Sequence, residues 1–384
     1  MKRLFFPVFM ILTCTFCKRH ELSKADEIHL KFKWDDIKLS DMIDTVVYVP
    51  LETNEESLIG EISQIFFQQN LYYVFDRQQK KVIIFDEKGR YITKLNYNGK
   101  GPCEYEYIHD IYVDEQGIIK ILSVSDPIKI IEYDIANQSC SETLFRGLAG
   151  SSFYPYGDGY LFFLPNGDER LTNRFFLFVV DSTGKVLDKW LPSHSYVGYS
   201  LMVNAFSSYK DTILFNKHFD NHIYQILPNK DVSVRYTLNF GKYQIPDDVK
   251  KLFQENFDDY LRNSDDYILK LDFFYETSNL LVFSYLTYQG DSPFFALFMK
   301  DKKELMLLKP KDDVGIAISN PINLLEDDFF ISFLEVSEFL HDKSPPFQKY
   351  RDRIYQTYLG LKAAVDTLSE TSNPVLIKYK FKSP

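Results

Sequence analysis

A glycine-bearing segment, residues 96–107, combines the residue types best suited to binding a ligand, in the order NYNGKGPCEYEY. Its glycines allow backbone turns that other residues avoid, and Pro102 stiffens the chain after them. We predict a ligand-binding role for five of its residues, namely Gly99, Gly101, Glu104, Tyr105 and Tyr107. The alternative is a plain connection between two strands. The glycines are not a phosphate cradle, because no GxGxxG or P-loop pattern opens a helix here.

Hydrolysis by carboxylates or by a metal is the second chemistry that the residue types allow. A glycosidase needs two facing carboxylates, and the 54 acidic residues do not single out such a pair. Asp110 and Asp114 could contribute to a calcium site, although no Asp-x-Asp-x-Asp loop contains them. His218 and His222 lie four residues apart, but at a strand turn, where that spacing does not bring both onto one metal. Without an HExxH or a GxSxG motif, we assign no catalytic residue, no metal ligand and no cofactor.

The chain has four cysteines, two of them near its N-terminus. Cys103 and Cys140 could pair in an exported protein, but one pair is not a disulfide framework, and neither has a metal-binding spacing. We therefore give these two cysteines no special role.

The N-terminal residues 1–17, MKRLFFPVFMILTCTFC, have the layout of an export signal. Two basic residues precede an apolar run, residues 4–12, that is too short to span a bilayer. The run ends in Ile-Leu-Thr-Cys, as in a bacterial lipobox, so we predict that Cys14 is lipidated, with Cys17 as the rival. The alternative is an ordinary signal peptide. Residues 18–43 are expected to form a tether that contains one early strand, residues 28–34.

The segment 96–107 must be positioned by the residues before it, and residues 59–95 read as four short strands separated by tight turns. Such an antiparallel meander is one blade of a β-propeller if it repeats. It does repeat, because Phe85, Tyr133 and Val180 mark equivalent hairpins with a period of roughly 47 residues. A strand at residues 44–51 can complete a sixth blade with the last strand, closing the ring and removing its open edge. We predict an all-β fold over residues 44–384, a six-bladed β-propeller of four-stranded antiparallel blades.

Two helical insertions interrupt the repeats, at about residues 246–263 and 347–371. In both, apolar residues recur at steps of three and four. Pro246 and the two aspartates after it suit the start of a helix. We expect the first insertion to cover one face of the disc, and the alternative is a lip to a binding pocket.

Composition narrows the class of partner. The net charge of −10 and the absence of a Lys/Arg cluster exclude nucleic-acid binding, which requires neutralisation of phosphates. The fractions of 45% hydrophobic and 26% charged residues are those of a globular protein. The 34 Phe and 27 Tyr favour strands, because aromatic side chains fit a pleated, half-buried surface.

Six short segments are spread along the chain: VPLET followed by LIGEI, then FDEKGRYI, NGKGPCEY, DNHIYQI and NPVLIKYKF. In these segments the chain resembles the six-bladed β-propeller lipoproteins of Bacteroides-type bacteria, whose blades are related to NHL repeats. The resemblance extends from about residue 45 to residue 382. Members typically have glycine where Cys103 stands and Thr-Ile-Tyr at residues 222–224. The resemblance implies an exported lipoprotein with no assigned chemistry that binds a protein or a glycan-related ligand.

We therefore expect a non-catalytic binding module, anchored to the outer membrane through Cys14. In such bacteria the signal for the cell surface is acidic after the lipidated cysteine. Here Lys18, Arg19 and His20 follow, which favours an anchor that faces the periplasm. The alternative function is a calcium-dependent hydrolase or lyase with carboxylates around the central channel.

Overall fold

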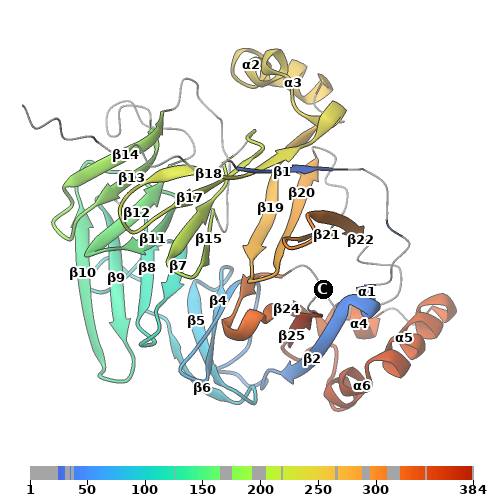
Figure 1. Ribbon diagram of the computed structural model, residues 1–384. Helices are drawn as coiled ribbons and strands as arrows, with labels where there is room; N and C mark the ends of the chain where they lie inside the picture. Colours follow the sequence, from blue (N-terminus) through green and yellow to red (C-terminus); the bar gives the residue numbers. More distant parts are fainter. Residues whose placement is uncertain are drawn as a thin grey trace, which may run out of the picture.

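The computed structural model describes residues 25–30, 35, 39–124, 126–164, 175–192, 205–217, 219–263, 267–287, 295–308, 321–341 and 344–382. The export signal, with Cys14 and Cys17, lies outside these residues, as do His218 and most of the expected tether. The described strands form six sheets arranged around a central axis, which confirms the six-bladed β-propeller (Figure 1).

The first three blades each have four antiparallel strands in sequence order, counted from the centre outward. Blade one consists of β3 (Ile62–Gln68), β4 (Leu71–Asp76), β5 (Lys81–Asp86) and β6 (Tyr91–Leu95). Blade two consists of β7 (Ile108–Val113), β8 (Ile119–Ser123), β9 (Ile128–Asp134) and β10 (Ser139–Phe145). Blade three consists of β11 (Ser152–Tyr156), β12 (Gly159–Phe163), β13 (Phe175–Val180) and β14 (Val186–Pro192).

The other three blades follow the same plan with additions. Blade four consists of β15 (Phe206–Tyr209), β16 (Thr212–Phe215), β17 (His222–Ile226) and β18 (Val232–Asn239). Blade five consists of β19 (Ile268–Glu276), β20 (Leu280–Thr287), β21 (Phe295–Met299) and β22 (Glu304–Leu308). Blade six consists of β23 (Asn323–Leu324), β24 (Phe330–Leu334), β25 (Val375–Phe381) and, on its outer edge, β2 (Ile43–Pro50).

Burial explains why the middle strands are apolar runs while the outer strands alternate. All residues of β5 except the last are buried, because both of its faces are covered, whereas exposed and half-buried residues dominate β10. The hairpin turns repeat as well. The Asp86 carboxylate accepts hydrogen bonds from the Lys88 and Arg90 amides, and Gly89 follows at φ 81°. Asp181 and Gly184 form the same turn in blade three, which confirms the alignment of the hairpins.

The ring is closed by the two ends of the chain, as expected. Strand β2 pairs antiparallel with β25, so that Tyr48 lies opposite Ile377. Asn373 then fixes the junction with blade one. Its Nδ2 donates to the carbonyl oxygens of Glu52 (2.7 Å) and Ser57 (2.9 Å), and its Oδ1 accepts from the Ile59 amide (2.9 Å).

The early strand begins two residues before the expected range, of which residues 31–34 lie outside the described residues, and it has a partner that the sequence did not indicate. Strand β1 (Asp26–His29) pairs in parallel with β18 and gives blade four a fifth strand. A parallel partner more than 200 residues away leaves no local signal, whereas hairpins carry one in their turns.

Both helical insertions are present, but each is broken. The first consists of α2 (Asp247–Glu255) and α3 (Phe257–Asn263), because Asn256 has extended dihedral angles. The second contains α5 (Pro345–Thr357) and α6 (Leu359–Val365), separated at Tyr358. Short helical elements complete the fold: α1 (Leu39–Met42), η1 (Gly241–Tyr243), η3 (Glu326–Asp328) and α4 (Val336–His341). Among the described residues no helix is long and apolar enough to cross a membrane.

Candidate functional site

A central cavity of about 140 Å³ is enclosed by the innermost strands, and all six blades contribute to its lining. The lining includes Gln64, Phe66 and Gln68 of β3 and Asp110 to Val113 of β7. Concave sites with a few polar groups on an apolar wall are the usual form of ligand sites.

One wall of the cavity is a row of four aromatic rings, one from each of blades one to four, which we call the aromatic arc: Phe66, Tyr112, Tyr154 and Phe206. Successive ring centroids are 6.0, 4.9 and 6.1 Å apart, and each pair meets edge to face. This is the geometry that aromatic quadrupoles favour. All four rings are only half-buried, so they keep part of their surface for a ligand.

Asp110 forms the polar part of the cavity and ties three blades together. Its Oδ1 accepts from the Gln64 side chain of blade one (2.9 Å) and from the Ile111 amide (3.0 Å). Its Oδ2 accepts from the Phe153 amide of blade three (3.1 Å). Burial raises the pKa of Asp110 to about 6, and these hydrogen bonds oppose the rise. The carboxylate is therefore mostly ionised at neutral pH, with its oxygens engaged by the protein.

The other polar groups of the cavity are neutral. Asp110 is the only acidic or basic residue of its lining in the part of the chain that the structure describes. The Tyr275 hydroxyl donates to the Ile322 carbonyl (2.5 Å), and the Asn323 amide donates to the Ile65 carbonyl (3.0 Å). Gln64, Gln68, the buried Ser207 and the exposed Ser208 complete the polar lining.

The two carboxylates considered for calcium take part in separate networks. Asp110 bridges the inner strands, whereas the Asp114 Oδ1 accepts from the Gln116 and Ile118 amides in the β7–β8 turn (3.1 and 2.9 Å). Within the described ranges no group of three or more His, Cys, Asp or Glu side chains could hold a metal ion. The Nδ1 atom of His222 lies 2.6 Å from Asp220 Oδ1, and Tyr224 donates to the same carboxylate, so His222 takes part in a surface network.

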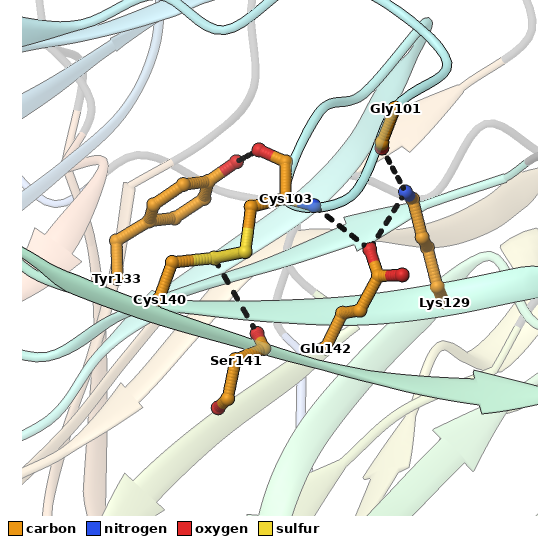
Figure 2. The surroundings of a disulfide bond; sticks show 7 residues. All are labelled: Gly101, Cys103, Lys129, Tyr133, Cys140, Ser141 and Glu142. Carbon is orange, nitrogen blue, oxygen red and sulfur yellow. Dashed lines mark hydrogen bonds and ion pairs between the residues drawn. A yellow bond between two sulfur atoms is a disulfide. The ribbon is translucent and has the colours of Figure 1, made fainter.

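The segment 96–107 is fastened to the outer strands of blade two, and a disulfide is the main fastening (Figure 2). Cys103 and Cys140 are bonded, which corrects our view that these cysteines have no special role. The Cys103 amide donates to Glu142 (3.0 Å), and Tyr133 donates to the Cys103 carbonyl (2.5 Å). Lys129 completes the group by pairing with Glu142 (3.0 Å). The sequence did not reveal the pairing, because it depends on how the segment folds back over β10.

Four of the five residues predicted to bind a ligand are used within the segment itself. A Cβ on Gly99 would lie 2.0 Å from Glu104 Oε2, so a side chain there would displace the Glu104 carboxylate, whereas the backbone of Gly99 makes no unusual turn. The same oxygen of Glu104 accepts from the Gly101 amide (2.8 Å). Tyr105 is fully buried, and its hydroxyl donates to the Leu95 carbonyl (3.3 Å). Tyr107 is 57% exposed, with Lys80 over its ring.

None of the five residues lines the central cavity, and their role in binding stays a prediction. The residue of the segment with a left-handed backbone is Cys103, at φ 57°, which agrees with the glycine that related proteins typically have there. The aromatic arc, in contrast, was missed. The sequence carries one sign of it, because an aromatic residue recurs at the equivalent position of successive inner strands, at Phe66, Tyr112 and Tyr154. Buried core positions are often aromatic as well, so this recurrence does not single out a cavity.

Comparison with solved structures supports the fold. A Bacteroides fragilis protein described as a "putative exported protein" matches with a TM-score of 0.76 and 17% identity, over 94% of this chain and 100% of that chain. A member of the DUF4221 family from Bacteroides vulgatus matches with a TM-score of 0.53 and 11% identity, over 88% and 97% of the two chains. At these identities the likeness shows the fold alone. No curated protein matches the chain.

Membership of a family is shown by the sequence itself. Residues 26–380 match the family described as a domain of unknown function, DUF4934. The match covers all six blades, both helical insertions and strand β1. The chain therefore belongs to the DUF4934 family.

Proposed function

We propose that the protein is a lipid-anchored binding module of the cell envelope, and that its central cavity receives part of a protein or of a glycan-related ligand. The observation that carries the proposal is the aromatic arc, whose four half-buried rings face one cavity. An exported location is supported by the likeness to the B. fragilis protein. The Cys103–Cys140 disulfide is also typical of proteins outside the cytoplasm.

A binding role fits the cavity better than catalysis does. General acid–base chemistry requires titratable groups that can reach a substrate. In the described lining the one acidic or basic side chain is Asp110, and both of its oxygens accept hydrogen bonds from the protein. Burial raises the pKa of Tyr112 and Tyr275, which keeps these two hydroxyls protonated at neutral pH. The aromatic surface and the neutral amides and hydroxyls are suited to holding a ligand without changing it.

The anchor is proposed to be Cys14, with the body of the protein facing the periplasm from the outer membrane. The test is acyl labelling of the full-length chain in its native host type, with Cys14→Ala and Cys17→Ala compared side by side. We expect Cys14→Ala to abolish the label and release the protein from the membrane fraction, because stable anchoring requires the acyl chains. A label that persists in Cys14→Ala would contradict the proposal.

The binding function is tested with a pair of matched substitutions in the purified mature chain. Ser208→Trp fills the cavity from an exposed position, and Ser141→Trp places the same side chain on the exposed side of β10, outside the cavity. Thermal unfolding is followed against panels of oligosaccharides and short peptides. A ligand at about 100 times its Kd stabilises the folded state by about 2.7 kcal/mol, which raises Tm by a few degrees.

The expected result is a rise in Tm for wild type and Ser141→Trp with the same ligands, and no rise for Ser208→Trp. If no member of either panel raises Tm, or if the rise survives in Ser208→Trp, the central cavity is not the binding site.

A further inference from the structure

We infer that the central cavity binds a neutral hydroxylated ring, one pyranose unit of an uncharged saccharide, packed against Tyr112 and Tyr154. The inference rests on the proposed function and makes its ligand specific. It follows from the charge, the surface chemistry and the size of the cavity, taken in turn.

The charge of the lining favours a neutral ligand. An anionic ligand would meet the Asp110 carboxylate with no basic side chain in the described lining to compensate for it. A cationic ligand could not pair closely with the one carboxylate, because Asp110 is buried and both of its oxygens are covered by hydrogen bonds from Gln64, Ile111 and Phe153. Burying a charge without a partner is costly, so both kinds of ligand are disfavoured.

The surface chemistry matches a sugar ring. A pyranose has C–H groups on its faces and hydroxyl groups around its edge, so it needs an aromatic surface flanked by neutral hydrogen-bonding groups. Tyr112 and Tyr154 supply that surface, with ring centroids 4.9 Å apart. Gln68 and Ser208 lie on the same lining and can donate or accept. Burial, and then the neighbouring Tyr154, raise the pKa of Tyr112, so its hydroxyl stays protonated at neutral pH.

The size of the cavity sets the length of the bound segment. A cavity of about 140 Å³ holds roughly ten water molecules. That space suits one or two sugar rings rather than a long polymer threaded through the disc. The saccharide would therefore enter end-on, with its terminal unit in the cavity.

The test is an array of neutral and acidic oligosaccharides, probed with the mature chain and three variants. Tyr154→Ala removes a ring of the aromatic arc, and Tyr154→Phe removes only its hydroxyl. Tyr355→Ala removes a half-buried aromatic ring from α5, outside the cavity, as the matched control. Thermal unfolding of each variant establishes that it is folded before the array is probed.

We expect neutral oligosaccharides to bind, with affinity reduced about tenfold or more by Tyr154→Ala, less by Tyr154→Phe, and not by Tyr355→Ala. Preference for acidic oligosaccharides, or binding that Tyr154→Ala leaves unchanged, would overturn the inference. If only a peptide raises Tm, and Ser208→Trp prevents that rise, the saccharide is wrong while the binding module stands. If Tyr154→Ala proves unfolded, Ser208→Trp takes its place on the array, with the same expected loss.

Discussion

The Cys103–Cys140 disulfide gives the prediction whose magnitude follows most directly from the structure. The perturbation is the double variant Cys103→Ser/Cys140→Ser, which removes the bond without leaving a free thiol. The bond joins positions separated by 37 residues. The loss of chain entropy in the unfolded state that such a loop imposes corresponds to about 4 kcal/mol. Because the hydrogen bonds of Cys103 to Glu142 and Tyr133 remain available, we expect the native segment to keep its position.

The assay is equilibrium unfolding in urea, followed by tyrosine and tryptophan fluorescence. We expect the double variant to lose about 3–4 kcal/mol of the free energy of unfolding, with a somewhat larger m-value because its unfolded chain is less compact. Wild type treated with dithiothreitol is the control and should behave like the variant. A difference below about 1 kcal/mol would refute the reasoning, since it would mean that the bond does not restrict the unfolded chain.

Three further predictions concern single contacts. Gly99→Ala should lower the free energy of unfolding in urea by about 1–2 kcal/mol, because its Cβ displaces the Glu104 carboxylate from the Gly101 amide. In a Glu104→Ala background this cost should largely vanish, and equal costs in both backgrounds would contradict the explanation. Since the pKa of Asp110 is about 6 in the folded state against 3.8 ordinarily, the folded state binds the proton more tightly. The free energy of unfolding should therefore fall by about 2 kcal/mol from this group as pH rises from about 4 to 7. Asp110→Asn should remove this fall in the free energy of unfolding with rising pH. If the variant shows the same fall as wild type, other groups cause it. Asn373→Ala should cost about 3 kcal/mol, because it removes three hydrogen bonds of the ring closure and leaves the Ser57 carbonyl and the Ile59 amide without that partner, against under about 1 kcal/mol for Asn137→Ala at an exposed turn. Similar costs would show that closure does not depend on Asn373.

Most of the scaffold could be predicted from the sequence, because the information that specifies a blade is local. Each third-to-fourth hairpin carries its own turn signal, as with Asp86 and Gly89 or Asp181 and Gly184. The middle strands are apolar along their whole length because neighbouring blades cover both faces. Closure of the ring could also be predicted from the sequence, because the strand before blade one had no other partner.

Features that depend on distant contacts could not be predicted in the same way. The parallel pairing of β1 with β18 has no turn between its strands, and the breaks at Asn256 and Tyr358 interrupt apolar patterns that look continuous. The disulfide requires the segment 96–107 to fold over β10, which residue types do not indicate. The same holds for the binding residues, because Tyr105 and Tyr107 look alike in sequence, yet one is fully buried and the other is 57% exposed.

The most direct test of the central cavity as the binding site is a calorimetric titration of one oligosaccharide, selected on the array, into wild type and Ser208→Trp side by side. The account predicts binding to wild type and an affinity at least about a hundredfold lower for Ser208→Trp, because its indole would occupy the space of the ligand. Equal affinities would contradict the account, since a ligand that tolerates a filled cavity must bind elsewhere on the propeller.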